Sequence, residues 1–205
     1  MARYLNEREV GFDADTIGFP NIGACMGVVL QTDNGLYGFH AMPGDVDRIA
    51  GFLQFIQNSG LHGNNVHLYG SCIRSKRCGG SESQWKTEMT SLAGGLNYHG
   101  PVSGFDMPAY PNRKDGTADT TYLEYRRDTV GSKCKIYYKR MSKMTVDTGT
   151  NPTADPIGRI TPRRGAFVVE PPRVEVALNA TIIRTFWNKG EMHEVPSRDI
   201  DTFDV

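Results

Sequence analysis

Two apolar runs, separated by a short polar turn, restrict the first part of this chain to folds that contain a β-hairpin. The first run ends at Leu30 and the second begins at Leu36, with Gln31-Thr32-Asp33-Asn34-Gly35 between them. Asn-Gly is the strongest short hairpin signal, because both residues tolerate a positive φ. The sequence therefore predicts two antiparallel strands joined by a two-residue turn at Asn34-Gly35.

Each arm of this hairpin carries one residue with catalytic potential. Cys25 lies on the first arm between Gly23 and Gly27, and His40 lies on the second arm. A neighbouring imidazolium lowers the pKa of a thiol from about 8.5 to roughly 3.5–7.5. Flanking glycines let backbone N–H groups approach a reacting carbonyl. These residues predict a thiol nucleophile and its base, while a small buried cysteine with only a packing role is the alternative.

The predicted turn places a constraint on this hypothesis. A two-residue turn at Asn34-Gly35 pairs His40 with Val29, about 13 Å along the strand from Cys25. We therefore predict that the chain departs from regular pairing between Gly23 and Gly27, with Cys25 before the paired part of its arm. A valine at Gly27 is then expected to damage activity more than stability, because a β-branched residue resists the φ values that a bulge needs.

Charge and composition narrow the class of protein. The 205 residues contain 23 Lys+Arg and 23 Asp+Glu, a balance that disfavours binding to nucleic acid. The N-terminus is charged where a secretory signal needs an apolar core, and no window approaches the ~18 apolar residues of a membrane span. Four cysteines at irregular spacing indicate free thiols in a reducing compartment.

The order of predicted elements indicates an α/β (α+β) sandwich with a mixed β-sheet and two helices. Residues 1–20 show no clear period and are expected to be an extended lead-in. Asp45 is a candidate N-cap for the first helix, and Ser81 with Gln84 has the spacing of a capping box for the second. Beyond the hairpin, helices are expected at about 45–60 and 83–93, and strands at 66–69, 101–107, 121–127 and 133–139.

The composition divides the chain into a core of residues 1–140 and a proline-rich extension of residues 141–205. Six of the eleven prolines follow residue 150, so we expect an irregular extension packed on the same domain. Strands are expected there at Ala166–Glu170 and Val174–Trp187, followed by a flexible acidic end.

Other candidate sites have weaker support. The set of His62, His67, Cys72 and Cys78 matches no compact zinc spacing, so no metal site is predicted. No phosphate-loop or dinucleotide fingerprint is present, so no cofactor is predicted. A basic segment that contains Arg77 is expected to be a solvated loop, with docking of an acidic partner as the alternative.

The hairpin resembles a known family. Gly23-Ala24-Cys25, the apolar strand and turn after it, and Gly38-Phe39-His40-Ala41-Met42-Pro43 are similar to the CheD-type chemoreceptor glutamine deamidases. Leu68-Tyr69-Gly70 resembles a strand end of that family. The 15-residue separation of Cys25 and His40 is also similar to the cytotoxic necrotizing factor toxins, which share the fold and the Cys-His chemistry.

This resemblance implies a protein-glutamine deamidase that needs no metal or cofactor. Cys25 attacks a glutamine carboxamide of a partner protein with His40 as base, ammonia leaves, and water hydrolyses the thioester to glutamate. A backbone carbonyl, as in the necrotizing-factor toxins, or Thr16 would orient the histidine.

The chain departs from the family at Ala24, where the family has Ser, and in its proline-rich C-terminal part. That extension favours a toxin or effector over a chemotaxis enzyme, made in the bacterial cytoplasm and exported into a target cell without a cleavable signal. The expected partner is a protein with an exposed glutamine, without nucleic acid or a membrane span. Two alternatives stay open: another thiol hydrolase or transglutaminase-like enzyme on the same residues, and a binding protein in which Cys25 is structural.

Overall fold

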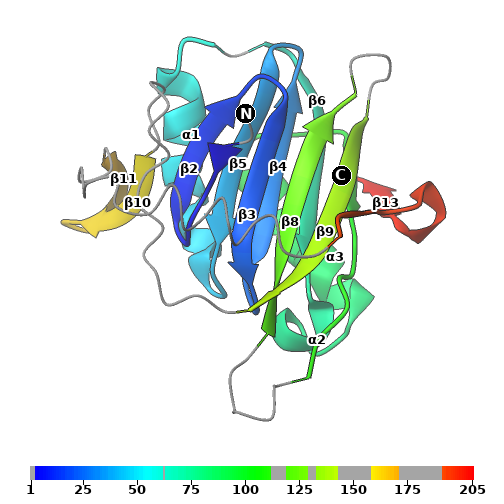
Figure 1. Ribbon diagram of the computed structural model, residues 1–205. Coiled ribbons are helices and arrows are strands. Elements are labelled where there is room, and N and C mark those ends of the chain that lie inside the picture. Colours follow the sequence, from blue (N-terminus) through cyan, green and yellow to red (C-terminus); the bar gives the residue numbers. More distant parts are fainter. Residues whose placement is uncertain (1–2, 62, 112–118, 129–132, 143–157, 171–190) are drawn as a thin grey trace, which may run out of the picture.

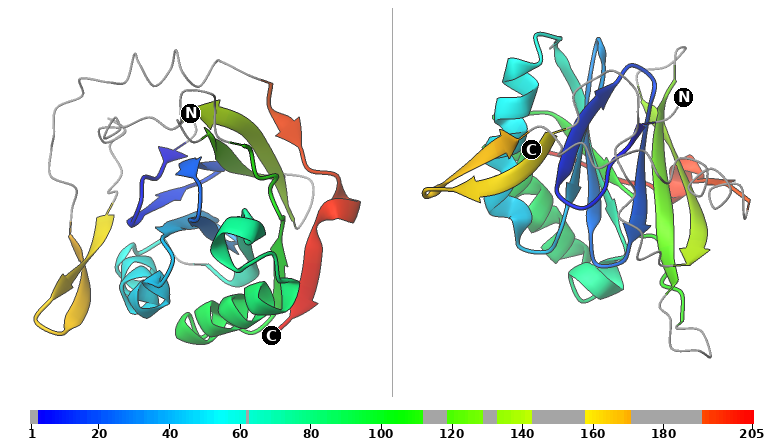
Figure 2. Two further views of the ribbon diagram at one scale, coloured as in Figure 1. Left: turned by 90° about the horizontal axis from the view of Figure 1, so that it is seen from below. Right: turned by 60° about the vertical axis from the view of Figure 1, so that its left-hand side comes forward.

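The computed structural model describes residues 3–61, 63–111, 119–128, 133–142, 158–170 and 191–205. Two β-sheets pack face to face, and helices cover the outer face of the larger sheet (Figure 1; Figure 2). The predicted α/β sandwich with a mixed sheet is thus confirmed, in the form of three layers: helices, a large sheet and a small sheet.

The large sheet has eight strands and holds the predicted hairpin at its centre. Its strands, in spatial order, are β11 (Ala166–Glu170), β10 (Gly158–Arg163), β2 (Glu9–Asp13), β5 (Gly35–Ala41), β4 (Met26–Thr32), β6 (Asn65–Cys72), β7 (Pro101–Gly104) and β13 (Asp201–Asp204). The small sheet has five strands: β1 (Arg3–Tyr4), β3 (Thr16–Ile22), β8 (Asp119–Arg127), β9 (Cys134–Ser142) and β12 (His193–Glu194).

The helices begin close to the predicted positions. The predicted N-cap role of Asp45 is wrong, because Asp45 lies within a 3₁₀ turn, η1 (Asp45–Arg48), whose N-cap is Gly44. This turn leads into α1 (Ile49–Asn58), so the α-helix starts later than expected. Ser81 caps α3 (Glu82–Gly95) by accepting a 3.2 Å hydrogen bond from the Gln84 amide, as predicted. Two short elements complete the set, α2 (Arg74–Arg77) and η2 (Ser197–Asp199).

The turn of the central hairpin lies one residue earlier than predicted. Asp33 and Asn34 form it, and Gly35 is already paired in β5 with a φ of 154°. Glycine is favoured at this fourth position of a common β-turn. His40 consequently lies opposite Gly27. The offset between Cys25 and His40 therefore shrinks from four residues to two, or about 7 Å along the strand.

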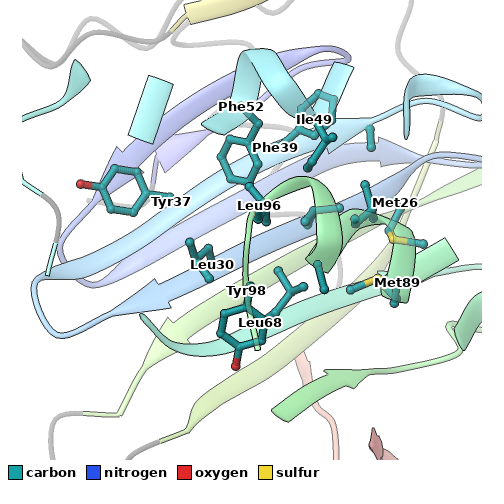
Figure 3. Close-up of a cluster of buried hydrophobic side chains, with 14 of the residues drawn as sticks. Met26, Leu30, Tyr37, Phe39, Ile49, Phe52, Leu68, Met89, Leu96 and Tyr98 are labelled. Atoms are coloured by element: carbon teal, nitrogen blue, oxygen red, sulfur yellow. The ribbon is translucent and has the colours of Figure 1, made fainter. Parts of the chain in front are cut away.

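Alternating side chains of β4 divide the core in two. Met26, Val28 and Leu30 face the helices, where they pack with residues of α1 and α3 (Figure 3). Val29 and Cys25 face the small sheet, in a second cluster that contains Phe19 of β3. Both clusters are nearly inaccessible to solvent. The central hairpin is buried on both faces, which explains its almost continuous apolar sequence.

Both ends of the described chain are more regular than expected. Residues 3–22 contribute β1, β2 and β3 and are not merely a lead-in. The acidic end forms β13, which pairs with β7, and the Phe203 ring packs against Trp85 at 5.6 Å between ring centroids. Segment 166–170 is the predicted strand, here β11, whereas Val174–Trp187 lies outside the described residues.

Gly27 is predicted to be required for packing and not for a bulge, because it lies within the regular β4–β5 ladder. A Cβ at Gly27 would approach Leu123 Cδ2 to 2.6 Å and Phe19 Cδ2 to 2.8 Å. Gly27→Val should therefore lower the free energy of unfolding by about 1–3 kcal/mol or more through overpacking, measured by urea denaturation. Gly23→Val is the matched control, since a Cβ there meets nothing within 4 Å. Equal stability of the two variants would contradict this view.

Candidate active site

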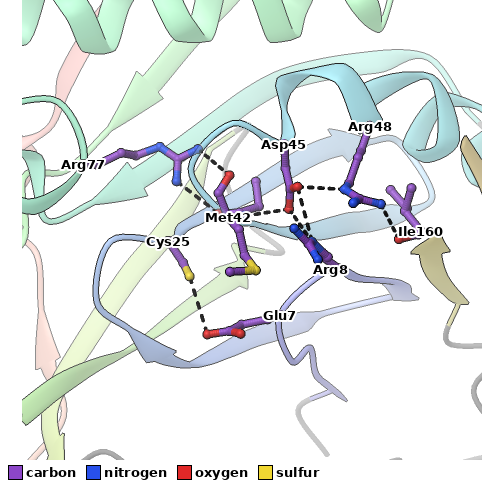
Figure 4. Close-up of polar contacts among 9 residues, drawn as sticks. Glu7, Arg8, Cys25, Met42, Asp45, Arg48, Arg77 and Ile160 are labelled. Atoms are coloured by element: carbon purple, nitrogen blue, oxygen red, sulfur yellow. Dashed lines mark hydrogen bonds and ion pairs between the residues drawn. The ribbon is translucent and has the colours of Figure 1, made fainter. Parts of the chain in front are cut away.

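Cys25 lies immediately before β4, at the end of the ladder between β4 and β5. The prediction that Cys25 precedes the paired part of its arm is confirmed. The predicted irregular pairing at Gly27 is wrong, because Gly27 pairs regularly with His40, and within the described residues no hydrogen bond joins the Cys25 sulfur to His40 Nε2. The side chain is 5% exposed and belongs to the core between the two sheets. Figure 4 shows it beside Met42 and Glu7. The thiol is thus close to the surface but covered.

His40 faces the same inter-sheet core and is completely buried. Its Nδ1 lies 2.7 Å from the Leu5 carbonyl oxygen, and its ring packs edge-on against Phe19. A carbonyl can only accept, so Nδ1 must carry the hydrogen, which leaves the lone pair of a neutral ring on Nε2. Among the described residues, nothing forms a hydrogen bond with Nε2. His40 is therefore held in the tautomer that a general base needs.

The orienting group is the Leu5 carbonyl and not Thr16. Leu5 is fixed in turn, because its own amide donates to the Gly18 carbonyl of β3 at 2.9 Å. Along β3, Ile17 and Phe19 point into the inter-sheet core, so Thr16 and Gly18 lie on the opposite, outer face. Of the two candidates from the sequence, the backbone carbonyl is the one that contacts His40.

One turn covers both candidate catalytic side chains. We call residues 5–8 the Leu5–Arg8 turn. Its Glu7 Oε1 lies 3.9 Å from the Cys25 sulfur, at the long end for a hydrogen bond from a thiol, and its Arg8 amide donates to the His40 carbonyl at 2.8 Å. Arg8 has a left-handed φ of 66° and pairs with the buried Asp45 at 3.2 Å (Figure 4).

Burial keeps both groups neutral at rest. Loss of hydration, followed by the charge of Glu7, raises the pKa of Cys25 to about 12, against the opposing effect of Arg77. Burial lowers the pKa of His40 to about 4. At rest, Cys25 is therefore a neutral thiol and His40 is a neutral imidazole. The expectation of a thiolate stabilised by an imidazolium is wrong for this structure, because neither charge is adequately solvated.

The structural importance of Arg77 is not visible in the sequence. The expectation of a solvated basic loop is wrong for this residue, because its side chain on α2 is only 2% exposed and forms an ion pair with Glu88 at 2.6 Å. Arg77 also donates to the Ala24 and Ala41 carbonyls, which are neighbours of the two candidate catalytic residues. No motif indicates this contact, because it joins segments that are distant in the sequence.

The other sequence candidates lie apart from this site. His67 donates to or accepts from the Ser103 hydroxyl at 2.8 Å and stacks on Tyr69, while Cys72 is part of the helix-side core. Within the described ranges, no three potential metal ligands gather into a group. In the same ranges, no helix has the length and apolar character needed to cross a membrane.

Comparison with known proteins identifies no relative: neither a family model, a curated protein nor a solved structure matches the chain significantly. The function is therefore argued from the geometry of the site and from the resemblance of the hairpin.

Glu7 is predicted to suppress the reactivity of Cys25. Removing its carboxylate in Glu7→Ala takes away a negative charge that raises the pKa of the thiol. The thiolate fraction at pH 8 should then rise, and iodoacetamide should alkylate Cys25 several-fold faster, as followed by peptide mass spectrometry. Glu82→Ala, which removes an exposed carboxylate on α3, is the control. An unchanged rate in Glu7→Ala would show that Glu7 does not influence the thiol.

Acid should destabilise the fold through His40. Its pKa in the folded protein, about 4, lies below the ordinary 6.5, so the unfolded chain takes up the proton first. The stability is complete above about pH 6.5 and falls by about 3 kcal/mol as the pH drops to 4. In His40→Asn, whose amide can still donate to Leu5, urea denaturation should show a correspondingly smaller fall. The same pH dependence in both proteins would refute this assignment.

Proposed function

We propose that the protein is a cysteine-dependent protein-glutamine deamidase with Cys25 as nucleophile and His40 as general base. The observation that carries the proposal is the state of His40. Its Nδ1 is fixed by the Leu5 carbonyl, and its Nε2 lone pair is unused among the described residues, on the sheet face that also carries Cys25. A backbone carbonyl in the orienting role agrees with the resemblance to the necrotizing-factor toxins.

The neutral resting state favours general-base catalysis over attack by a preformed thiolate. As the Cys25 sulfur bonds to the carboxamide carbon, Nε2 of His40 takes the thiol proton and then passes it to the departing nitrogen, which leaves as ammonia. Water, deprotonated by the same Nε2, attacks the thioester carbon and releases the sulfur. The side chain of the substrate becomes glutamate, and the thiol regains its proton.

The proposed substrate is a glutamine on a partner protein, and the enzyme is a toxin or effector acting in a target cell. Support comes from the place of the thiol, which lies beside the exposed Glu7 side chain (Figure 4), since a protein-borne side chain needs access from the surface. The C-terminal residues add β10 and β11 to one sheet edge and β13 to the other, beyond the compact core of residues 1–140.

The competing function is that of a binding protein in which Cys25 is structural. A specific observation favours it: the thiol is 5% exposed and its pKa is raised to about 12. Cys72 and Cys134, which lie in the two cores and have no proposed chemical role, have the same raised pKa. Chemical activity must therefore be tested directly.

The geometry permits a test that does not require the unknown partner. In Glu7→Gln, a carboxamide replaces the carboxylate that lies 3.9 Å from the Cys25 sulfur. A working deamidase should convert this introduced carboxamide back to a carboxylate within the same molecule. Mass spectrometry of the N-terminal peptide should show the gain in mass that accompanies exchange of an amide nitrogen for oxygen, with release of ammonia.

Control variants show whether the conversion depends on the proposed catalytic residues. Adding Cys25→Ser or His40→Ala to Glu7→Gln should abolish the conversion, while Cys72→Ser should leave it unchanged. Cleavage of the backbone at this turn would indicate a peptidase instead. If the introduced carboxamide persists, and a cell lysate incubated with the wild-type protein gains no Glu-for-Gln sites, the deamidase proposal fails and the binding function is favoured.

A further inference from the structure

The guanidinium of Arg77 links segments that are far apart in the chain. Its Nη1 donates to the carbonyls of Ala24 at 3.0 Å and Ala41 at 3.1 Å, and its Nη2 donates to the carbonyl of Met42 at 3.3 Å. Its Nε and Nη2 both donate hydrogen bonds to the carboxylate of Glu88 on α3, at 2.9 and 2.6 Å. A guanidinium has five N–H donors, and these contacts engage every one of them.

The three carbonyls lie where the backbone ladder ends. Met26 and Ala41 form the last pair between β4 and β5 in the described part of the chain. Beyond this pair, Ala24 and Met42 lie on the two diverging chains, outside the register of the ladder. Arg77 therefore joins the two chains where the ladder pairing stops. The carbonyl groups that it contacts lie one residue before Cys25 on one chain and one to two residues after His40 on the other.

Both ends of the contact between Arg77 and the ladder end are held in place by other residues. The Arg77 side chain is 2% exposed, and α2 and α3 hold the two charged partners on the helical layer. On the other side, Met42 is fixed by Asp45, whose amide donates to the Met42 carbonyl and whose carboxylate accepts from the Met42 amide, both at 3.0 Å. Charge-assisted bidentate hydrogen bonds of this kind impose geometry more strictly than neutral ones.

We propose that Arg77 is a positioning residue that sets the separation between the Cys25 loop and the end of the His40 strand, with Glu88 as its anchor. Arg77 touches the carbonyls next to the two residues and not their reacting atoms. The proposal rests on the deamidase function for its catalytic meaning, but its structural content can be measured without activity.

The charges around the two groups agree with this role. The charged groups that act on Cys25 are Glu7 from the Leu5–Arg8 turn, Asp45 from η1 and Arg77 from α2. Arg77 and Asp45 also act on His40 of β5. Arg77 is the cation that lowers the pKa of Cys25, and it also lowers the pKa of His40. It therefore favours the state in which the imidazole is a free base.

The test compares Arg77→Lys with Arg74→Lys. Arg74 lies on the same short helix, and its side chain is 6% exposed. It forms an ion pair with Asp201 of β13 at 2.6 Å and lies over the Trp85 ring, so its contacts differ from those of Arg77. A lysine at position 77 retains the charge but cannot bridge three carbonyls and Glu88, so water should reach the imidazole. The His40 pKa, followed by NMR of the imidazole, should rise from about 4 toward its ordinary value.

Arg74→Lys should cost a comparable amount of thermal stability and leave the His40 titration unchanged. Amide hydrogen exchange should quicken at residues 24–26 and at Ala41 and Met42 only in Arg77→Lys. Should this variant fail to fold, Glu88→Gln keeps the guanidinium but weakens its anchor, and is expected to shift the His40 pKa in the same direction by less. A His40 titration that matches wild type in the Arg77 or Glu88 variant, or that moves equally in Arg74→Lys, would overturn the proposal.

A second measurement connects the contact to catalysis. In the Glu7→Gln background, Arg77→Lys should slow the conversion of the introduced carboxamide by about 10- to 100-fold, the range expected for a small misplacement of reacting groups. If the conversion proceeds at the same rate with lysine at position 77, Arg77 does not position the site. If there is no conversion even with Arg77 intact, the lysate assay decides the deamidase function, and the His40 titration alone decides the role of Arg77.

Discussion

The register between β4 and β5 determines the rest of this structure. It sets Gly27 opposite His40, and the absence of a side chain at Gly27 leaves the space that Phe19 and Leu123 of the small sheet occupy. A slip of one strand by one residue would exchange the two faces of that strand. A slip of β4 would turn Met26 toward the small sheet, and a slip of β5 would turn His40 toward the helices. Because the two sheets meet over Gly27, the β4–β5 register determines which side chains lie together in the inter-sheet core.

The inter-sheet core is shielded from solvent. The free-energy cost of placing a charged histidine in it explains the neutral state of His40. Burial of an imidazolium without a partner is costly, so His40 is neutral, and the single carbonyl of Leu5 satisfies its Nδ1–H. The Nε2 atom, unpaired among the described residues, is itself unfavourable in such surroundings. A fold that only needed packing at this position would be more stable with an apolar residue. A buried imidazole with one unpaired nitrogen, on the same side of the large sheet as the Cys25 thiol, is therefore not explained by packing alone.

The sequence predicts local features well and long-range ones poorly. The hairpin, the capped helix at Ser81 and the position of Cys25 before the ladder depend on neighbouring residues, and all three are confirmed. The predicted turn is wrong by one residue, because Asn34-Gly35 suits two different turn positions. This small error doubles the expected offset between Cys25 and His40 along the strand.

The features that the sequence does not reveal all depend on tertiary contacts. The first strands and β13 lack a clear period of their own and are stabilised by pairing with β5, β8 and β7. The burial of Arg77 follows from the Glu88 carboxylate and the ladder end, which approach one another only in the folded chain. Charged residues in short basic segments are most often solvated, so no local pattern distinguishes this arginine from its neighbours.

The Leu5–Arg8 turn combines a fixed part and an accessible part within four residues. Leu5 is completely buried, donates its amide to Gly18 and packs over Gly38, so the carbonyl that orients His40 belongs to the rigid core. Glu7, two residues later, is exposed and reaches the thiol only with its carboxylate. In the proposed mechanism, a substrate side chain would displace Glu7 by rotation of one side chain, without disturbing the hydrogen bond at Nδ1. His40 would keep its tautomer while Cys25 is uncovered, so the burial of both side chains is compatible with the proposed glutamine on the surface of another protein.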